Sequence, residues 1–370
     1  MFLERKVVTA PDSIRRHTSV PALQVPDRTA TVTIVIPCYN YARYLPQAVS
    51  SALAQKHVQP DVIVVDDAST DDSLSVAQAL AQRDERVTVI ANRKNSGPVI
   101  TFNNGLAQAR GEFLVRLDAD DMLTPGSLAR AVSMMQAHPS IGLAYGHPLH
   151  FTSELPKARQ KATGWTLWPG RDWLRDRCRF GYNVITSPEV LMRRSVVDLV
   201  GGQQDLAHTH DMEMWLRISA FSDVGYIHGA DQAWHRDHPD SLSARQVNVL
   251  RDLLERRDAF RVLFSGIAGG IPEASEMHQT AMAAIAIDAI ELANRQYDTL
   301  NPDLSLVHHY RDIAISLVPD PTRLRGWQGL EKRAALGPGR ARRHLPFVAE
   351  RIYRGLRGRY LRQRWHRIGV

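Results

Sequence analysis

The sequence predicts an α/β protein in which a mainly parallel sheet is covered by helices on both faces. Over the first third of the chain, short β-branched runs alternate with stretches of helical periodicity. These runs are apolar at nearly every position, as in strands that are buried on both faces. Regular alternation of strands and helices is typical of parallel sheets. Beyond residue 246 the pattern is helical only, which predicts a C-terminal helical region.

The expected elements follow in chain order. We expect the first four strands at residues 32–36, 62–65, 87–90 and 113–117, with helices near 45–54, 74–82 and 100–109. A helix at 126–137, a strand at 141–145, an extended run at 184–192, a helix at 211–220 and a strand at 224–227 come next. Between them, Trp165, Trp168 and Trp173 either line a binding groove or pack in the core. Helices at 247–264, 274–294 and 304–317 complete the pattern.

Length and composition suggest one large domain with smaller additions. The 370 residues are 44% apolar and 23% charged, which are ordinary globular values. We divide the chain into an N-terminal extension at 1–28, a sheet domain at 29–245, a helical region at 246–320 and a basic amphipathic tail at 321–370.

Three observations favour a cytoplasmic location. Cys38 and Cys178 form neither a disulfide framework nor a metal-ligand spacing. The charged residues 1–6 are not followed by the apolar segment of a signal peptide. The longest apolar helical run, 281–287, stops at Asp288, well short of the roughly 20 residues that a membrane span needs.

The positive charge of the chain is concentrated in its tail. Residues 321–370 hold 14 Arg and Lys and two Glu, a net charge of +12, so the net +7 of the chain leaves −5 on the other 320 residues. Ile352, Leu356 and Tyr360 recur at helical spacing among the arginines. We interpret the tail as an amphipathic helix lying on an anionic membrane surface, on the inner face of the cell membrane. A solvated helix and a nucleic-acid-binding arm are the alternatives.

Alternating carboxylates follow the fourth expected strand. Asp118, Asp120 and Asp121 come directly after Val-Arg-Leu at 115–117. Carboxylates at i and i+2 on an extended backbone point the same way and repel each other unless a cation lies between them. Hard divalent cations choose oxygen ligands, and Mg²⁺ keeps positions open for substrate phosphates. The motif therefore predicts a metal–diphosphate site, with a solvated turn in which Asp121 lies near a helix N-cap as the alternative.

Polar residues end two further strands of the same sheet. Pro37-Cys38-Tyr39-Asn40 follows the first strand and Asp66-Asp67-Ala68-Ser69 follows the second. Ligands of open parallel sheets bind beyond the carboxyl ends of the strands. The three strand ends together predict one binding site.

In family order, the chain carries motifs that resemble those of glycosyltransferase family 2. The resemblance covers roughly residues 31–243. It rests on Val-Thr-Ile-Val-Ile-Pro-Cys-Tyr-Asn at 32–40, Val-Val-Asp-Asp-Ala-Ser-Thr-Asp at 64–71, Asn95-Ser-Gly97 with Asn103-Asn104-Gly105-Leu106, Arg-Leu-Asp-Ala-Asp-Asp at 116–121, His210-Asp211-Met-Glu213-Met-Trp215-Leu-Arg217, and Trp234-His235-Arg236-Asp237-His238. The chain departs from the family's usual pattern at Phe102, where Arg is common, and at His210, where Glu is common.

The resemblance implies a GT-A fold and a metal-dependent, inverting glycosyltransferase that uses a nucleotide-sugar donor. Asp120 and His238 would hold Mg²⁺ or Mn²⁺, and Asp211 would be the general base. The residues implied for the donor are Pro37, Tyr39, Asn40, Asp66, Asp67, Asn95, Gly97, Asn103, Asp118 and Arg236. The acceptor would be a glycan or a lipid-linked glycan of a bacterial surface polysaccharide, and a UDP-sugar is the favoured donor.

Three other readings compete with this one. A nucleotidyltransferase needs a Gly-rich loop with Arg and Lys after the first strand, and Pro-Cys-Tyr-Asn-Tyr-Ala at 37–42 does not resemble it. A non-catalytic protein that binds glycan or a partner through the same fold is opposed by the presence of Asp118, Asp120 and Asp211. A nucleic-acid binder is opposed by the −5 charge outside the tail. We expect no nucleic-acid partner.

Overall fold

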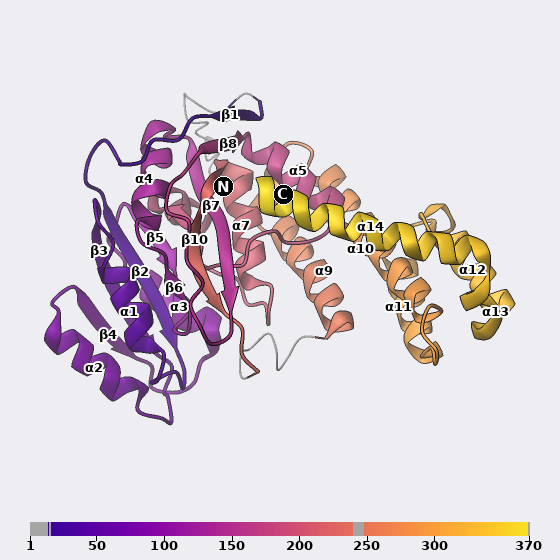
Figure 1. Ribbon diagram of the computed structural model, residues 1–370, viewed down its shortest axis with the longest axis horizontal. Helices are drawn as coiled ribbons and strands as arrows, with labels where there is room; N and C mark the ends of the chain where they lie inside the picture. The colour runs from indigo at the N-terminus through magenta and orange to yellow at the C-terminus, as the bar shows by residue number, and fades with distance from the viewer. Residues whose placement is uncertain (1–13, 15, 240–247, 369–370) are drawn as a thin grey trace, which may run out of the picture.

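The computed structural model describes residue 14, residues 16–239 and residues 248–368 (Figure 1). Within them, ten strands form one mixed sheet with helices on both faces, in the order β1-β8-β10-β7-β9-β5-β2-β3-β4, with β6 paired to β10. The strands are β1 Thr18–Val20, β2 Thr31–Cys38, β3 Gln59–Asp66, β4 Val87–Ala91, β5 Phe113–Arg116, β6 Met122–Leu123, β7 Ile141–Phe151, β8 Gly164–Trp168, β9 Leu191–Arg193 and β10 Asp223–Arg236.

The helices of the sheet domain are α1 Leu45–Leu53, α2 Ser73–Arg83, α3 Gly97–Leu106, α4 Ser127–Ala137, α5 Gly170–Phe180, α6 Arg194–Val200 and α7 His210–Phe221. The C-terminal helices are α9 Val249–Ser265, α10 Ala274–Gln296, α11 Leu304–Leu317, α12 Trp327–Leu336, α13 Pro338–Arg343 and α14 Leu345–Ile368, with short 3-10 turns at Ile267–Gly270 and Pro321–Arg323. Half of the expected N-terminal extension, residues 1–13 and 15, and the expected boundary at 245/246 lie outside the described residues.

The first four strands expected from the sequence form one of two parallel parts of the sheet. β5, β2, β3 and β4 are neighbours in that order, and each pair is parallel. Cys38 at the end of β2 is in register with Asp66 at the end of β3. The carboxyl ends of these strands therefore meet at one edge, as the sequence predicted.

The two faces of the sheet are covered by different helices. Along β2, Ile34 and Ile36 belong to the hydrophobic cluster under α1 and α4, whereas Val35 belongs to the cluster under α3 and α7. This alternation follows from the two-residue period of a strand. Gly105 lets α3 approach the sheet closely, because a Cβ there would lie 2.4 Å from Val35 Cγ1.

β10 is much longer than the strand expected at 224–227. It pairs in parallel with β7 and passes through register shifts near Asp231 before it reaches Arg236. The Trp234–Arg236 segment is therefore part of the sheet and is carried to the edge where β5 ends. β9 lies antiparallel between β7 and β5 and joins the two parallel parts.

The expected extended run at 184–192 is wrong for most of its length. Only Leu191–Arg193 pairs as a strand. The side chain of Glu189 accepts hydrogen bonds from the backbone N–H groups of Thr186 (2.6 Å) and Ser187 (3.1 Å). These bonds occupy donors that a ladder would use, and Pro188 has no N–H to give.

The Trp-containing stretch is more regular than expected. It forms β8 and α5, and Trp165, Trp168 and Trp173 are all buried in the core, so they pack and do not line a groove. β8 also pairs with β1, so residues 18–20 of the expected extension belong to the sheet.

The C-terminal helices share a core with the sheet domain. Phe260 of α9 and Ile285 of α10 are fully buried in the same hydrophobic cluster as Trp215 of α7. α14 then runs back toward the sheet domain (Figure 1). There the indole N–H of Trp365 donates a 2.8 Å hydrogen bond to the carbonyl oxygen of Val184. Among the described residues, none of the helices combines the length and hydropathy that crossing a membrane requires.

Candidate active site

The Asp118–Asp121 turn follows β5 and is held from both sides. Arg116 forms a two-pronged ion pair with Asp118, with N–O distances of 2.8 and 3.0 Å. The backbone N–H of Asp121 donates to the carbonyl oxygen of Asp118 at 3.0 Å, which closes the turn. In this turn Asp118 is partly exposed, while Asp120 and Asp121 are buried.

Each buried carboxylate of the turn has a histidine partner. Asp120 Oδ2 lies 2.8 Å from His238 Nε2. Asp121 Oδ2 lies 3.0 Å from His235 Nδ1, and Asp121 Oδ1 accepts the backbone N–H of Arg236 at 2.8 Å. Residues 235–238 thus contact both buried carboxylates of the turn, because β10 extends far enough to reach it.

The crowding of carboxylates changes their protonation. Burial, together with the charges of Asp121 and Asp118, raises the pKa of Asp120 to about 6. Burial also raises the pKa of Asp121, against the hydrogen bond from His235. Burial opposes a charge on His235, but the hydrogen bond and charge of Asp121 outweigh it and raise the pKa of His235 to about 9. The turn is therefore an acidic site that attracts positive charge.

Arg236 supports the turn from beneath. Its Nε donates to the carbonyl oxygen of Asp120 at 3.0 Å, and its second terminal nitrogen donates to Gln47 at 2.8 Å. The guanidinium lies between the rings of Tyr44 (4.4 Å) and Phe151 (4.5 Å). With these partners Arg236 is buried and positions the backbone of the turn.

The edge formed by β2 and β3 carries a small network. Asn40 adopts a left-handed φ of 60°, and its side-chain oxygen accepts the backbone N–H of Thr70 at 2.7 Å. Asp66 is buried and accepts the backbone N–H of Ser69 at 3.1 Å, while its other oxygen, Oδ1, has no hydrogen-bond partner among the described residues. Tyr39 is 41% exposed and Pro37 half-buried beside it.

Asp67 holds the loop before α3. Its carboxylate accepts hydrogen bonds from the backbone N–H of Ser96 (2.8 Å), the backbone N–H of Gly97 (2.9 Å) and the side-chain amide of Asn92 (2.7 Å). Gly97 has φ +83°, a conformation that favours glycine. Asn95 lies exposed on the same loop.

Asn103 lies apart from this group. Its amide donates to the carbonyl oxygen of Gln203 at 2.8 Å and accepts the N–H of the same residue at 2.9 Å. A Cβ on Gly202 would lie 2.3 Å from the Asn103 side-chain oxygen, so the two segments touch closely. The side chain thus joins α3 to the segment before α7.

Asp211 opens α7 and contacts the irregular segment at 184–190. Its Oδ2 accepts the Ser187 hydroxyl at 2.8 Å, and its Oδ1 accepts the backbone N–H of Met212 at 2.6 Å. Burial and the charge of Arg116 lower the pKa of the neighbouring His210, against the carboxylates of Asp211 and Asp118. The first turn of α7 therefore lies near the Asp118–Asp121 turn. Glu213 instead forms a buried ion pair with Arg217 at 2.9 Å, a structural role.

Some residues of the site were not predicted. Ser187, Glu189, Tyr44 and Arg116 contact or support the predicted residues. Ser187 and Glu189 lie in a segment that was expected to be a strand, and the Ser-Pro-Glu pattern at 187–189 was a signal of an irregular turn. Burial raises the pKa of Glu189 to about 7.

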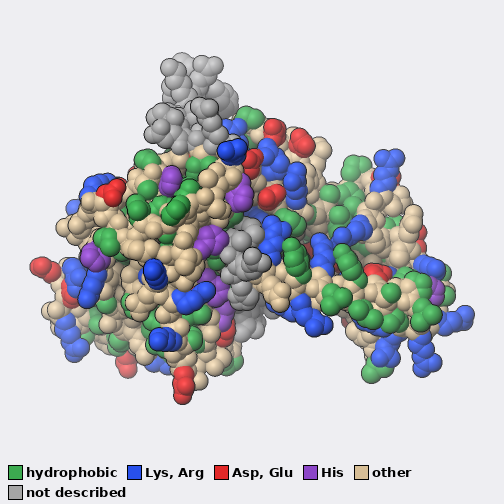
Figure 2. Space-filling view, turned by 45° about the horizontal axis from the view of Figure 1, so that its top comes forward, with side chains coloured by type: hydrophobic (Ala, Val, Ile, Leu, Met, Phe, Trp, Pro, Cys, Tyr) green, Lys and Arg blue, Asp and Glu red, His purple; other side chains and the backbone are tan. Residues whose placement is uncertain are grey.

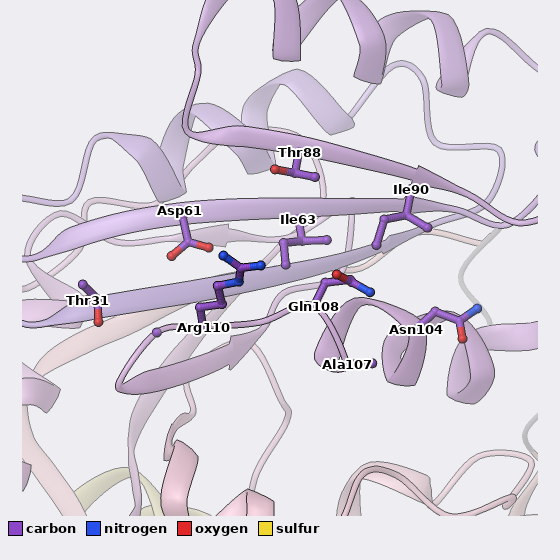
Figure 3. A pocket seen from close by; sticks show the side chains of 10 residues that line it. Thr31, Asp61, Ile63, Thr88, Ile90, Asn104, Ala107, Gln108 and Arg110 are labelled. Atoms are coloured by element: carbon purple, nitrogen blue, oxygen red, sulfur yellow. The ribbon is translucent and has the colours of Figure 1, made fainter.

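A separate pocket of about 710 Å³ lies away from these carboxylates. Figure 3 shows it beside α3, along the face of the sheet, with side chains of β3, β4 and the loop after α3 around it. Asp61, Ile63, Asn104 and Arg110 are among its lining residues. None of the residues predicted for the site lines it.

Comparison with known proteins identifies relatives of this chain. Residues 33–201 match the family described as Glycosyl transferase family 2. An uncharacterized glycosyltransferase of Nostoc sp. is 39% identical over 115 residues, 31% of this chain and 35% of that protein. One of Haemophilus influenzae is 27% identical over 195 residues, 51% of this chain and 60% of that protein. The succinoglycan biosynthesis protein ExoO of Rhizobium meliloti is 39% identical over 111 residues, covering 30% and 31%. The chain thus spans between about a third and 60% of these relatives.

Among solved structures, TarS 1–349 of S. aureus in complex with UDP-GlcNAc matches with a TM-score of 0.52 and 16% identity, covering 82% of this chain and 91% of that one. Another TarS structure gives a TM-score of 0.53, covering 82% and 55%. At this identity the likeness concerns the fold, which is the GT-A fold.

Proposed function

Because this chain belongs to glycosyltransferase family 2, we propose that it transfers a sugar from a nucleotide-diphosphate donor to a hydroxyl of a glycan or lipid-linked acceptor. The observation that carries the proposal is the contact between Asp120 of the Asp118–Asp121 turn and His238, just beyond the end of β10. Relatives named for succinoglycan and teichuronic acid biosynthesis support a role in bacterial surface polysaccharide synthesis.

Asp120 and His238 would hold Mg²⁺ or Mn²⁺. Their ligand atoms are 2.8 Å apart, close to the roughly 2.9 Å between neighbouring corners of an octahedron with bonds of about 2.05 Å. The nitrogen of His238 that faces Asp120 is Nε2. The other ring nitrogen, Nδ1, is buried and has no hydrogen-bond partner among the described residues. When bound, the ion would neutralise the charge that develops on a diphosphate leaving group. Arg116 holds Asp118 beside it for the ribose or for a metal-bound water.

The donor nucleotide would lie over the ends of β2 and β3. The exposed ring of Tyr39 offers a stacking surface for the base. Asp66 lies at the end of β3, with a buried carboxylate oxygen that has no hydrogen-bond partner in the described part of the chain. Pro37 and Asn40 shape the same edge. TarS has been solved with UDP-GlcNAc, and this favours a UDP-sugar as the donor.

Asp67, Asn95, Gly97 and Asn103 would act less directly. Asp67 shapes the loop that carries Asn95 and Gly97 through its three hydrogen bonds. Asn103 and Arg236 have protein partners for their polar groups, so their contribution would be to position the loop and the turn around the donor.

Asp211 would be the general base. A carboxylate at the N-terminus of a helix is stabilised in its ionised form, which is the form that takes a proton. It would deprotonate the acceptor hydroxyl as that oxygen attacks the anomeric carbon from the side opposite to the diphosphate. One displacement of this kind inverts the configuration, and the diphosphate leaves with the bonding electron pair. General-base assistance is worth about 10²–10⁴ in rate.

We extend the proposal to an anionic membrane surface as the partner of α14. Arg351 and Arg354 face inward and pair with Asp298. Leu345, Ile352, Tyr353, Leu356 and Tyr360 of α14 are each more than half exposed. Figure 2 shows hydrophobic side chains along the lobe that holds the C-terminal helices, with Lys and Arg at its margin. Exposed apolar side chains interspersed with basic ones suit the interface of an anionic bilayer.

A thermal-shift panel tests the donor proposal. UDP, GDP, dTDP and CMP are each added with Mn²⁺ or with EDTA to the wild type and to Asp120→Asn. A ligand at 100 times its dissociation constant stabilises by about 2.7 kcal/mol, which such a measurement detects. We expect a metal-dependent shift with UDP that the variant loses. No shift with any nucleotide would favour the non-catalytic alternative.

A further inference from the structure

Three side chains at the ends of β7 and β10, those of His150, His235 and Asp237, lie close together beside the carboxylate turn. His150 and His235 are in register across the two parallel strands, and their rings lie 4.9 Å apart. Asp237 Oδ1 lies 3.2 Å from His150 Nδ1 and 3.8 Å from His235 Nε2. The three ligand atoms all lie within 4.8 Å of one another.

The spacing suits a tetrahedral ion. With metal–ligand bonds of about 2.0–2.1 Å, two ligands of a tetrahedral site are roughly 3.3 Å apart. The separation of His150 from Asp237, 3.2 Å, is close to that value, while that of His235 is 3.8 Å and the three atoms together lie within 4.8 Å of one another. His150 and Asp237 are about half exposed, so their side chains have room to turn toward an ion, and solvent has access to the open coordination position.

The second nitrogen of His235 is already held as in a metal site. Metal-binding histidines commonly give their other ring nitrogen to a carboxylate, which fixes the orientation of the ring. Here Nδ1 of His235 lies 3.0 Å from Asp121 Oδ2, and this leaves Nε2 directed toward Asp237. The buried carboxylate behind the ring also favours a cation in front of it.

The donor set differs from that of the Asp118–Asp121 turn. Two imidazoles and one carboxylate suit Zn²⁺ and related transition-metal ions, whereas Mg²⁺ prefers oxygen ligands. None of the three ligands belongs to the pair formed by Asp120 and His238. The cluster therefore has its own ligands, and it contacts the carboxylate turn through His235 and Asp121.

We propose that His150, His235 and Asp237 form a second cation site, selective for Zn²⁺ or a similar transition-metal ion over Mg²⁺. A bound ion ties the end of β7 to the end of β10, and through His235 and Asp121 it braces the carboxylate turn. The site does not depend on the donor proposal.

Calorimetric titration of the full-length protein with Zn²⁺ alone tests the site. We expect one equivalent to bind to the wild type. His150→Ala and Asp237→Asn should each weaken binding at least about tenfold, since each removes a ligand. His309→Ala is the matched control, because His309 is exposed on α11 and should leave binding unchanged. Equal binding by the wild type and His150→Ala would overturn the proposal.

Asp120→Asn separates the two cation sites. It should keep the Zn²⁺ equivalent while losing the Mn²⁺-dependent shift with UDP. If Zn²⁺ binding is lost in Asp120→Asn and kept in His150→Ala, the ion occupies the donor site and the second site is refuted. If the wild type shows no shift with UDP but binds Zn²⁺ through His150, the donor proposal fails and the second site stands.

Discussion

The Ser187 hydroxyl donates a 2.8 Å hydrogen bond to Asp211 Oδ2 and so joins the irregular segment before β9 to the first turn of α7. Ser187 is buried and has φ 137°, an unusual value for a residue with a side chain. Its backbone N–H is held by Glu189. The position of the proposed base therefore depends on a contact between two segments that are 24 residues apart.

Asp211→Asn should lower transfer by about 10²–10⁴-fold, because the amide cannot accept the acceptor's proton. Donor binding should persist, since Asp211 does not contact the strand ends that would hold the nucleotide. Transfer rates and the shift with UDP and Mn²⁺ are measured on the same protein. A near-normal rate would remove Asp211 as the base.

Ser187→Ala should have a smaller effect than Asp211→Asn. The carboxylate stays, but it loses one of its two hydrogen bonds and with it a fixed orientation, so we expect the rate to fall on the order of tenfold. The KM for the donor should stay constant while kcat falls. Ser187→Thr keeps the hydroxyl and should restore part of the rate.

Asp120→Asn should abolish transfer and Mn²⁺-dependent nucleotide binding, because it removes the charged ligand of the proposed metal site. The control is Asp198→Asn, which changes an exposed carboxylate on α6 that pairs loosely with Arg194 at 3.5 Å. Calorimetry with Mn²⁺ and UDP checks both variants. Unchanged Mn²⁺-dependent binding by Asp120→Asn would refute the metal assignment.

Replacing Ile352 and Leu356 with Ser should weaken binding to vesicles of anionic phospholipid about tenfold or more, because the apolar face of α14 loses two buried contacts with the bilayer. Co-sedimentation with anionic and with neutral vesicles measures the effect. Leu23→Ser with Leu199→Ser is the control, since both residues are about half exposed and lie outside α14. Equal binding of the two double variants would contradict the anchor.

Point substitutions suit this test better than removal of the tail. Trp327, Leu330 and Phe347 are buried among the C-terminal helices, so truncation after Asp320 would strip a packed surface from the rest of the chain. The truncated chain would expose apolar side chains of α10 and confuse loss of the anchor with loss of stability.

Asp231 should make stability depend on acid pH. Its buried carboxylate lies 3.0 Å from His147 Nδ1 and 2.5 Å from Arg159. Burial opposes ionisation, but these hydrogen bonds outweigh it and hold the pKa of Asp231 well below its usual range. The resulting stability is present above the unfolded pKa of about 4 and is lost as the pH falls toward the folded value.

Asp231→Asn should therefore lower stability by about 1–3 kcal/mol near neutral pH, the cost of weakening buried charged hydrogen bonds. The difference in Tm between the wild type and the variant should be constant above about pH 5 and shrink below about pH 4. A difference that stays the same through the acid range would show that Asp231 is not ionised through its partners.

Local signals were sufficient for the frame of the site. Short, mainly apolar runs predicted β2, β3, β4 and β5, because strands that lie in a covered sheet need apolar residues at most positions. The acids after β3 and β5 then had to meet at one edge. The prediction of an extended run at 184–192 was wrong for most of its length. The Glu189 side chain accepts hydrogen bonds from the backbone N–H groups of Thr186 and Ser187, and hydrophobic patterning does not reveal such contacts.

The roles of several polar residues depend on contacts across the chain. Asp67 and Asn103 are tied to the backbone of Ser96, Gly97 and Gln203, which the family motif alone does not indicate. The long β10 brings His235 and His238 to the turn only because it stays paired with β7 through three register shifts.

By itself, the sequence determined the order of β2 to β5 with their helices, the carboxylates at the strand ends and the basic charge of the tail, since these depend on periodicity and composition along the chain. The tertiary structure decided which oxygen meets which nitrogen, and which face of α14 is free. Arg351 and Arg354 turn inward because Asp298 lies within reach of them, and this leaves Ile352 and Leu356 outside. Such choices depend on neighbours that are distant in sequence, and only folding brings them together.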